Sequence, residues 1–149
     1  MNDKKRILVI VLTCVFLSVI FTLINLLTHP DIPEGVIRIE CKNDKYLIKV
    51  DEIKTVEVSG QMINGKGEAR DITKEGILLS NLISEYCDDF SKVKVISDDE
   101  YYAELSASEI LNEEKAYILI TETTARLLVF GDKDSKRNVS NVKRIVLIK

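Results

Sequence analysis

The chain has 149 residues, of which 46% are hydrophobic and 30% are charged, and its formal net charge at pH 7 is −3. This length allows one domain with a single core beside a short additional segment. A mildly acidic chain whose basic residues are scattered gives no support to nucleic acid as a partner.

The first predicted element is an apolar run without any charged residue, Ile7–Leu27. As a helix rising about 1.5 Å per residue it would be about 31 Å long, close to the thickness of a bilayer's hydrocarbon core. We therefore expect a transmembrane helix over 7–27 that contacts the lipid bilayer. The basic residues of the preceding tail, 1–6, favour a cytoplasmic N-terminus. The predicted location is the cell membrane, with a single pass and an extracytoplasmic C-terminal part.

Two other interpretations of this run stay open. A cleaved signal peptide also begins with basic residues, but its apolar core is normally about 7–15 residues long and is followed by small residues. Here the exit from the run reads Leu26-Leu27-Thr28-His29-Pro30, which is a poor cleavage site. A lipoprotein signal is the third interpretation, because Val11-Leu12-Thr13-Cys14 has a faint likeness to a lipoprotein cleavage box. We favour the uncleaved anchor.

The rest of the chain divides into a tether and one domain. Both prolines, Pro30 and Pro33, fall in the segment 28–35, so a short and stiff tether is predicted there. Residues 36–149 are then a single extracytoplasmic domain.

Short strands separated by turn residues dominate the first half of this domain. Asn43-Asp44 and Asn64–Gly67 have the chemistry of turns. The predicted elements, in order, are strands Val36–Cys41 and Tyr46–Val50, a helical turn Glu52–Lys54, strand Thr55–Ser59 ending at Gly60, and a brief segment Glu68–Thr73.

The second half combines two helices with five strands. Ile77, Leu82 and Tyr86 recur at helical spacing, and the Ser106-x-x-Glu109 pattern is typical of a capping box at a helix start. The remaining predicted strands are Lys92–Ser97, Tyr101–Leu105, Ala116–Thr121, Arg126–Phe130 and Val142–Ile148. The predicted fold is α+β, a mixed β-sheet or partial barrel with two short helices, preceded by the transmembrane helix.

Five segments between Thr55 and Ile148 also resemble, in order, the conserved blocks of a known family. They are the helix start Lys74–Ile83, the strand and turn Val93–Tyr101, the helix start Leu105–Ile110, the strand Arg126–Gly131 and the closing strand Asn138–Ile145. The family is the sulfite-oxidase-type oxidoreductase molybdopterin-binding domain. The resemblance implies that fold, in a small form.

The resemblance does not extend to the metal ligand. The family holds molybdenum through one cysteine thiolate in the segment before the first helix, and Gly60–Lys74 contains no cysteine. Cys41 lies too early and Cys87 too late. Of the positions carried over, only Arg126 keeps a cation. We therefore predict no catalytic, metal-binding or cofactor-binding residues. The alternative is that the chain is a relative of molybdopterin-dependent oxidoreductases or an accessory redox subunit. Molybdopterin is expected as a cofactor only if this alternative holds.

Cys41 and Cys87 leave three possibilities open. An oxidising exterior permits a structural disulfide between them, but two buried free thiols and a redox pair fit the sequence as well.

The predicted function is a non-catalytic binding module, with an unknown surface protein or a small ligand as its partner. In the family that the sequence resembles, the segments that correspond to the turn at 98–102, the strand at 126 and the loop at 133–138 lie near the pocket. The predicted ligand face accordingly comprises Tyr101, Tyr102, Arg126, Lys133, Arg137 and Asn138.

Overall fold

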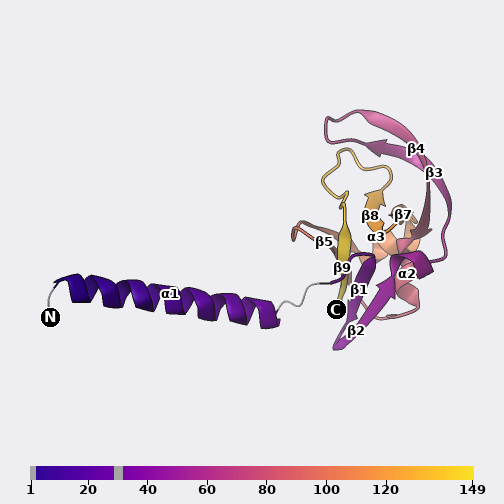
Figure 1. Cartoon of the computed structure of the whole chain (residues 1–149). Coiled ribbons are helices and arrows are strands. Elements are labelled where there is room, and N and C mark those ends of the chain that lie inside the picture. Colours follow the sequence, from indigo (N-terminus) through magenta and orange to yellow (C-terminus); the bar gives the residue numbers. More distant parts are fainter. Residues whose placement is uncertain (1–2, 29–31) are drawn as a thin grey trace. The chain divides into compact units, whose positions relative to one another are not determined.

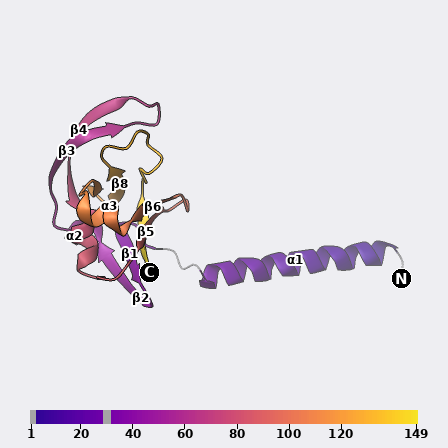
Figure 2. The same ribbon diagram turned by 180° about the vertical axis from the view of Figure 1, so that it is seen from behind.

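The computed structural model describes residues 3–28 and 32–149. The chain divides into two compact units, Met1–Asp31 and Ile32–Lys149. Helix α1 (Asp3–Thr28) belongs to the first unit. The second unit carries all the strands, as both views show (Figures 1 and 2). The middle of the predicted tether, including His29 and Pro30, lies outside the described residues.

Helix α1 corrects one part of the predicted fold class. Among the described residues we find no helix with both the length and the apolar character needed to cross a membrane. This finding contradicts the predicted transmembrane helix over 7–27. Contact with the bilayer and location at the cell membrane stay predictions.

The second unit is built from two β-sheets. The strands are β1 (Val36–Cys41), β2 (Asp44–Lys49), β3 (Val56–Ile63), β4 (Ala69–Leu78), β5 (Lys92–Ser97), β6 (Tyr102–Ser106), β7 (Ala116–Thr121), β8 (Thr124–Val129) and β9 (Val142–Ile148). One sheet has the order β2-β1-β9-β5-β6 and the other β3-β4-β7-β8. Strands β1 and β9 run parallel and the other paired strands antiparallel. The predicted α+β class is confirmed.

The main hydrophobic core lies between these sheets. In β1 and β6 every second residue is buried, as the period of two in a strand requires. Ile37 and Ile145 of the first sheet and Ile118 and Leu127 of the second have no exposed surface and belong to one cluster. Burying such a side chain stabilises the fold by about 1.5–3 kcal/mol.

Two short helices close this core, α2 (Leu79–Ser84) and α3 (Ala107–Asn112). Helix α3 begins at the predicted capping box, in which the Ser106 side chain accepts from the Glu109 amide while the Glu109 carboxylate accepts from the Ser106 amide. Helix α2 starts later than its apolar spacing predicted. Ile77 and Leu78 instead continue β4, because they pair with Ile118 and Tyr117 of β7.

Strand β3 also extends beyond its predicted end at Gly60. It forms a long curved ribbon with β4 that is prominent in both views (Figures 1 and 2). A Cβ atom at Gly60 would lie 2.5 Å from the Phe130 ring. Here glycine allows the aromatic ring to lie on the strand backbone and does not end the strand. Val58, Leu119 and Leu128 form a second small core under the ribbon.

A disulfide joins Cys41, at the end of β1, to Cys87, which follows α2. Both residues are buried in the main core, and their Cα atoms are 6.0 Å apart. Of the three possibilities left open by the sequence, the structure shows the disulfide. Cys14 is free.

Candidate ligand pocket

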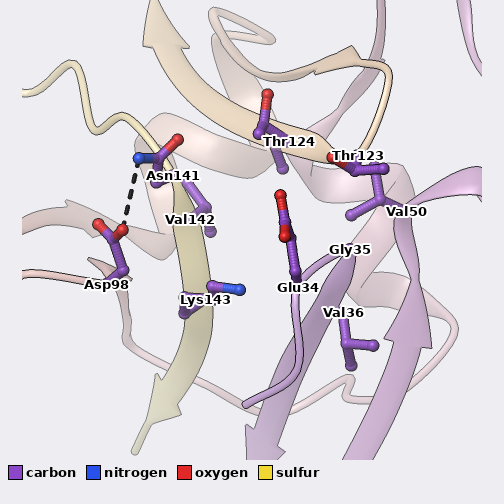
Figure 3. A pocket seen from close by; sticks show the side chains of 11 residues that line it. Glu34, Gly35, Val36, Val50, Asp98, Thr123, Thr124, Asn141, Val142 and Lys143 are labelled. Carbon is purple, nitrogen blue, oxygen red and sulfur yellow. Dashed lines mark hydrogen bonds between the residues drawn. The ribbon is translucent and has the colours of Figure 1, made fainter. Parts of the chain in front are cut away.

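A pocket of about 290 Å³ opens where one end of each sheet meets the other (Figure 3). We call it the sheet-end pocket. Its wall comes from the segment entering β1, the short 3₁₀ turn after β2, the β5–β6 turn, the β7–β8 turn and the start of β9. The lining residues are Glu34, Gly35, Val36, Val50, Asp98, Thr123, Thr124, Ala125, Asn141, Val142 and Lys143.

A β-bulge directs Lys143 into this pocket. On β9, Arg144 pairs with Ile96 of β5 and Val142 pairs with Ser97, so Lys143 is an extra residue without a partner on that strand. Bulges of this kind redirect one side chain and are frequent beside functional sites. The Lys143 ammonium donates to the carbonyls of Pro33, at 3.0 Å, and Ile32, at 3.5 Å. Because an ammonium has three donors, one remains for a ligand.

Glu34 reaches into the same space from the segment that enters β1, and Figure 3 shows its carboxylate between Lys143 and Thr124. The next residue, Gly35, has φ +71°, a conformation in which a side chain would be strained. Its carbonyl accepts from the Val50 amide at 2.8 Å, which fixes the turn. Glycine at 35 therefore sets the position of Glu34.

The opposite wall is a fixed pair of polar residues, Asp98 and Asn141. The Asp98 amide donates to the Asn141 carbonyl at 3.1 Å, and the Asn141 side-chain amide donates to the Asp98 carboxylate at 3.4 Å. Asn141 has φ +49°, which asparagine tolerates better than most residues. Thr123 of the β7–β8 turn and Thr124, the first residue of β8, add their hydroxyls to the wall, and the Thr124 hydroxyl donates to the Thr121 carbonyl at 3.1 Å.

The charges of the sheet-end pocket are not paired with one another. Within residues 32–149, Glu34, Asp98 and Lys143 each lack an ion-pair partner within 4.0 Å. The pocket thus offers two carboxylates and one ammonium that can pair with charges on a ligand.

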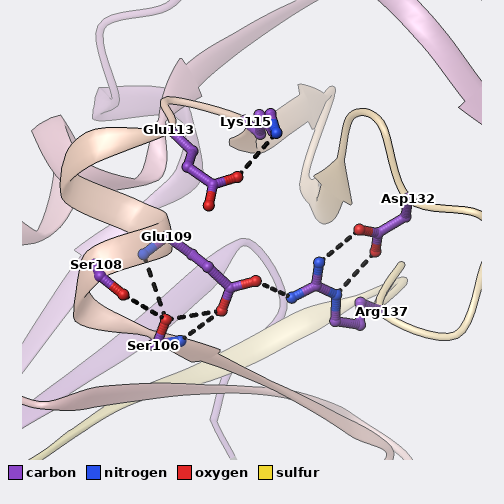
Figure 4. Close-up of polar contacts among 7 residues, drawn as sticks. All are labelled: Ser106, Ser108, Glu109, Glu113, Lys115, Asp132 and Arg137. Carbon is purple, nitrogen blue, oxygen red and sulfur yellow. Dashed lines mark hydrogen bonds and ion pairs between the residues drawn. The ribbon is translucent and has the colours of Figure 1, made fainter.

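A second polar cluster, which we call the Arg137 network, has the opposite character (Figure 4). The Arg137 guanidinium donates twice to Asp132, at 2.8 and 2.5 Å, and once to Glu109, at 2.6 Å. The hydrogen bond from Arg137, followed by that from the Ser106 amide, lowers the pKa of Glu109 to about 2. The two carboxylates likewise raise the pKa of Arg137. This network attaches the 131–141 loop to the start of α3.

The structure separates the residues of the predicted ligand face. Tyr101 and Asn138 line one small pocket of about 220 Å³, and the Tyr101 hydroxyl donates to the Lys136 carbonyl. Arg137 lies in its own network. Lys133 is exposed on the same loop.

The other two residues of that face lie on different sheets. Tyr102 is on the outer face of the five-stranded sheet, with the Lys94 ammonium 3.6 Å from its ring centre. Arg126 is on β8, where its inward-facing neighbours Ala125 and Leu127 belong to the main core, so its side chain is on the outer face of the four-stranded sheet.

Sequence reasoning missed the pocket residues Glu34, Thr124 and Lys143. Glu34 looked like part of a tether, although Gly35 beside it signals a turn. Lys143 fell within the predicted strand Val142–Ile148, and the bulge that redirects it depends on pairing with β5. Among the described residues no group of three or more His, Cys, Asp or Glu side chains is placed to hold a metal ion.

Comparison with protein-family models and with curated proteins finds no match for this chain. The resemblance to the sulfite-oxidase-type domain therefore stays a prediction.

Proposed function

We propose that residues 32–149 form an extracytoplasmic, non-catalytic binding module whose small polar ligand occupies the sheet-end pocket. The observation that carries the proposal is the β-bulge that turns Lys143 into a pocket whose charged groups are otherwise unpaired. Charged side chains that converge on one cleft without pairing with each other can pair with charges on a ligand, and such groups are typical of binding sites.

The disulfide supports both parts of this proposal. Disulfides persist in oxidising compartments, which favours an extracytoplasmic location. A redox role for Cys41 and Cys87 is less favoured because they are bonded to each other in the core, where neither offers a thiolate to a metal.

The binding part is tested by NMR on the full chain, held in a mild detergent because α1 exposes apolar side chains. The amide signals of Gly35, Thr124 and Lys143 are followed while zwitterionic, cationic, anionic and neutral polyhydroxy probes are added in turn. We expect saturable shifts of these signals with at least one probe class. Shifts confined to other surfaces, or no shifts with any class, contradict the proposal.

The location is tested by alkylating thiols in cells that produce the chain and counting labels after denaturation. An extracytoplasmic disulfide predicts one label, on Cys14. Labels on all three cysteines contradict an oxidising location.

A further inference from the structure

We infer that the ligand of the sheet-end pocket is a peptide-like zwitterion, a free amino acid or a dipeptide with an unmodified amine and an unmodified carboxylate. This inference rests on the proposed function, because it names the ligand class of the same pocket.

The first step is the charge of the pocket walls. Lys143 has one ammonium donor left after its bonds to the Ile32 and Pro33 carbonyls, and a carboxylate is the acceptor that pairs best with it. Glu34 and Asp98 can only accept hydrogen bonds as carboxylates, so they need a donor that is preferably cationic. A single ligand that carries both an ammonium and a carboxylate satisfies both walls.

The same arrangement disfavours ligands with one charge. A simple anion would bind Lys143 while facing the carboxylates of Glu34 and Asp98, and a simple cation would face the Lys143 ammonium. Such like-charge contacts are the usual means by which sites exclude the wrong partner. A neutral polyol would leave all three charges without a counter-charge.

The second step is size. The pocket volume of about 290 Å³ lies at the lower limit of the ~300–1,000 Å³ that is usual for small-ligand sites. A ligand as small as one amino acid or a dipeptide of two small residues therefore suits it. The Thr123 hydroxyl, the oxygen of the Thr124 hydroxyl and the side-chain amide of Asn141 supply donors and acceptors suited to a peptide group.

The third step is rigidity. Gly35 is fixed by its carbonyl bond to the Val50 amide at 2.8 Å, and Asn141 by its bonds with Asp98. Preorganised groups lose little conformational entropy on binding, which favours recognition of both ends of a small ligand.

The experiment is isothermal titration calorimetry of the full chain in mild detergent with alanyl-alanine, its N-acetyl derivative, its C-terminal amide and free alanine. We expect alanyl-alanine or alanine to bind, and each cap on the better ligand to weaken binding at least tenfold. Capped and uncapped forms binding equally, with NMR shifts in the pocket, would overturn the zwitterion and leave the proposed function standing. If only a different probe class shifts the NMR signals of the pocket, the zwitterion is also wrong and the proposed function stands. If no probe shifts these signals, both the zwitterion and the proposed function are wrong.

Variants assign each end of the ligand. Lys143→Gln should remove the preference for the free carboxylate over the amide, and Lys143→Arg should restore it at least in part. Glu34→Gln should remove the preference for the free amine. Lys54→Gln and Glu57→Gln are matched controls, exposed and outside the pocket, and both should bind as the unaltered chain does. If the carboxylate preference survives Lys143→Gln, the assignment of Lys143 is wrong.

Discussion

The Arg137 network and the sheet-end pocket are made from the same kinds of side chains, yet they use them in opposite ways. In the network, one cation is enclosed by two carboxylates at 2.5–2.8 Å. In the pocket, two carboxylates and one ammonium lack ion-pair partners within residues 32–149. The difference teaches that pairing, rather than residue type, separates a charge that holds the fold from a charge that is ready for a ligand.

Removal of the disulfide has the largest expected effect on the free energy of unfolding. The disulfide lies in the main core and not in the pocket lining, so we expect this effect to be on stability and not on binding. Its 46-residue separation corresponds to a loss of about 4 kcal/mol in the free energy of unfolding when the bond is absent, on a chain-entropy argument. We expect Cys41→Ala with Cys87→Ala to lower stability by about 2–4 kcal/mol in urea unfolding while ligand affinity at 25 °C changes less than twofold. Cys14→Ala is the control and should change neither quantity. If the double variant folds but no longer binds the ligand, the disulfide contributes to binding as well as to stability.

Next in size is Arg137→Ala. It leaves Glu109 and Asp132, whose side chains are 34% and 16% exposed, without their cation. Removing one partner of such hydrogen-bonded charges costs about 2 kcal/mol after allowance for solvent. Urea unfolding measures this loss. Lys133→Ala, an exposed cation on the same loop, is the control and should change stability by less than about 0.5 kcal/mol. If both variants lower the free energy of unfolding equally, the ion pairs of Arg137 do not stabilise the fold more than an exposed cation does.

Local chemistry explains what the sequence could predict. The Ser106–Glu109 capping box lies within four residues of the chain, and strands β5, β7 and β9 have their predicted bounds because their own β-branched and apolar residues favour a strand. Errors arose where distant residues decide. Strand β3 continues through Gly60 because that residue pairs with Ile72 of β4, and its lack of a side chain makes room for the Phe130 ring. Likewise, β7 keeps Ile77 and Leu78 in β4 although their spacing is helical. The predicted ligand face is spread over two sheets for the same reason. Its residues would lie close together only if the strands paired as they do in the family that the sequence resembles.

The pocket itself depends on such distant pairing. Lys143 faces the ligand space only because β9 carries one more residue than β5 at that point. Sequence patterns record the alternation of a strand but not the register of its neighbour.

A third test uses pH to isolate one carboxylate of the Arg137 network. The pKa of Glu109 is about 2 in the folded chain, below its ordinary value of 4.5, so the folded state binds this proton more weakly than the unfolded chain does. The resulting stabilisation is complete above about pH 5 and is lost as the pH falls through 4.5 toward 2. We expect the stability difference between the unaltered chain and Glu109→Gln to shrink over this range. Urea unfolding at a series of pH values measures it, and a difference that stays constant contradicts the ion pair.

The smallest expected change concerns the unpaired side of the comparison. Glu34 is exposed and lacks an ion pair within residues 32–149, so Glu34→Gln removes a charge that stabilises nothing in the folded chain. We expect the free energy of unfolding to change by less than about 0.5 kcal/mol, in contrast with Glu109→Gln. Urea unfolding of the two glutamine variants side by side makes the test, because both lose one carboxylate charge and keep nearly the same shape. If Glu34→Gln destabilises the chain as much as Glu109→Gln, then Glu34 holds the fold, and the sheet-end pocket loses the free carboxylate on which its ligand class depends.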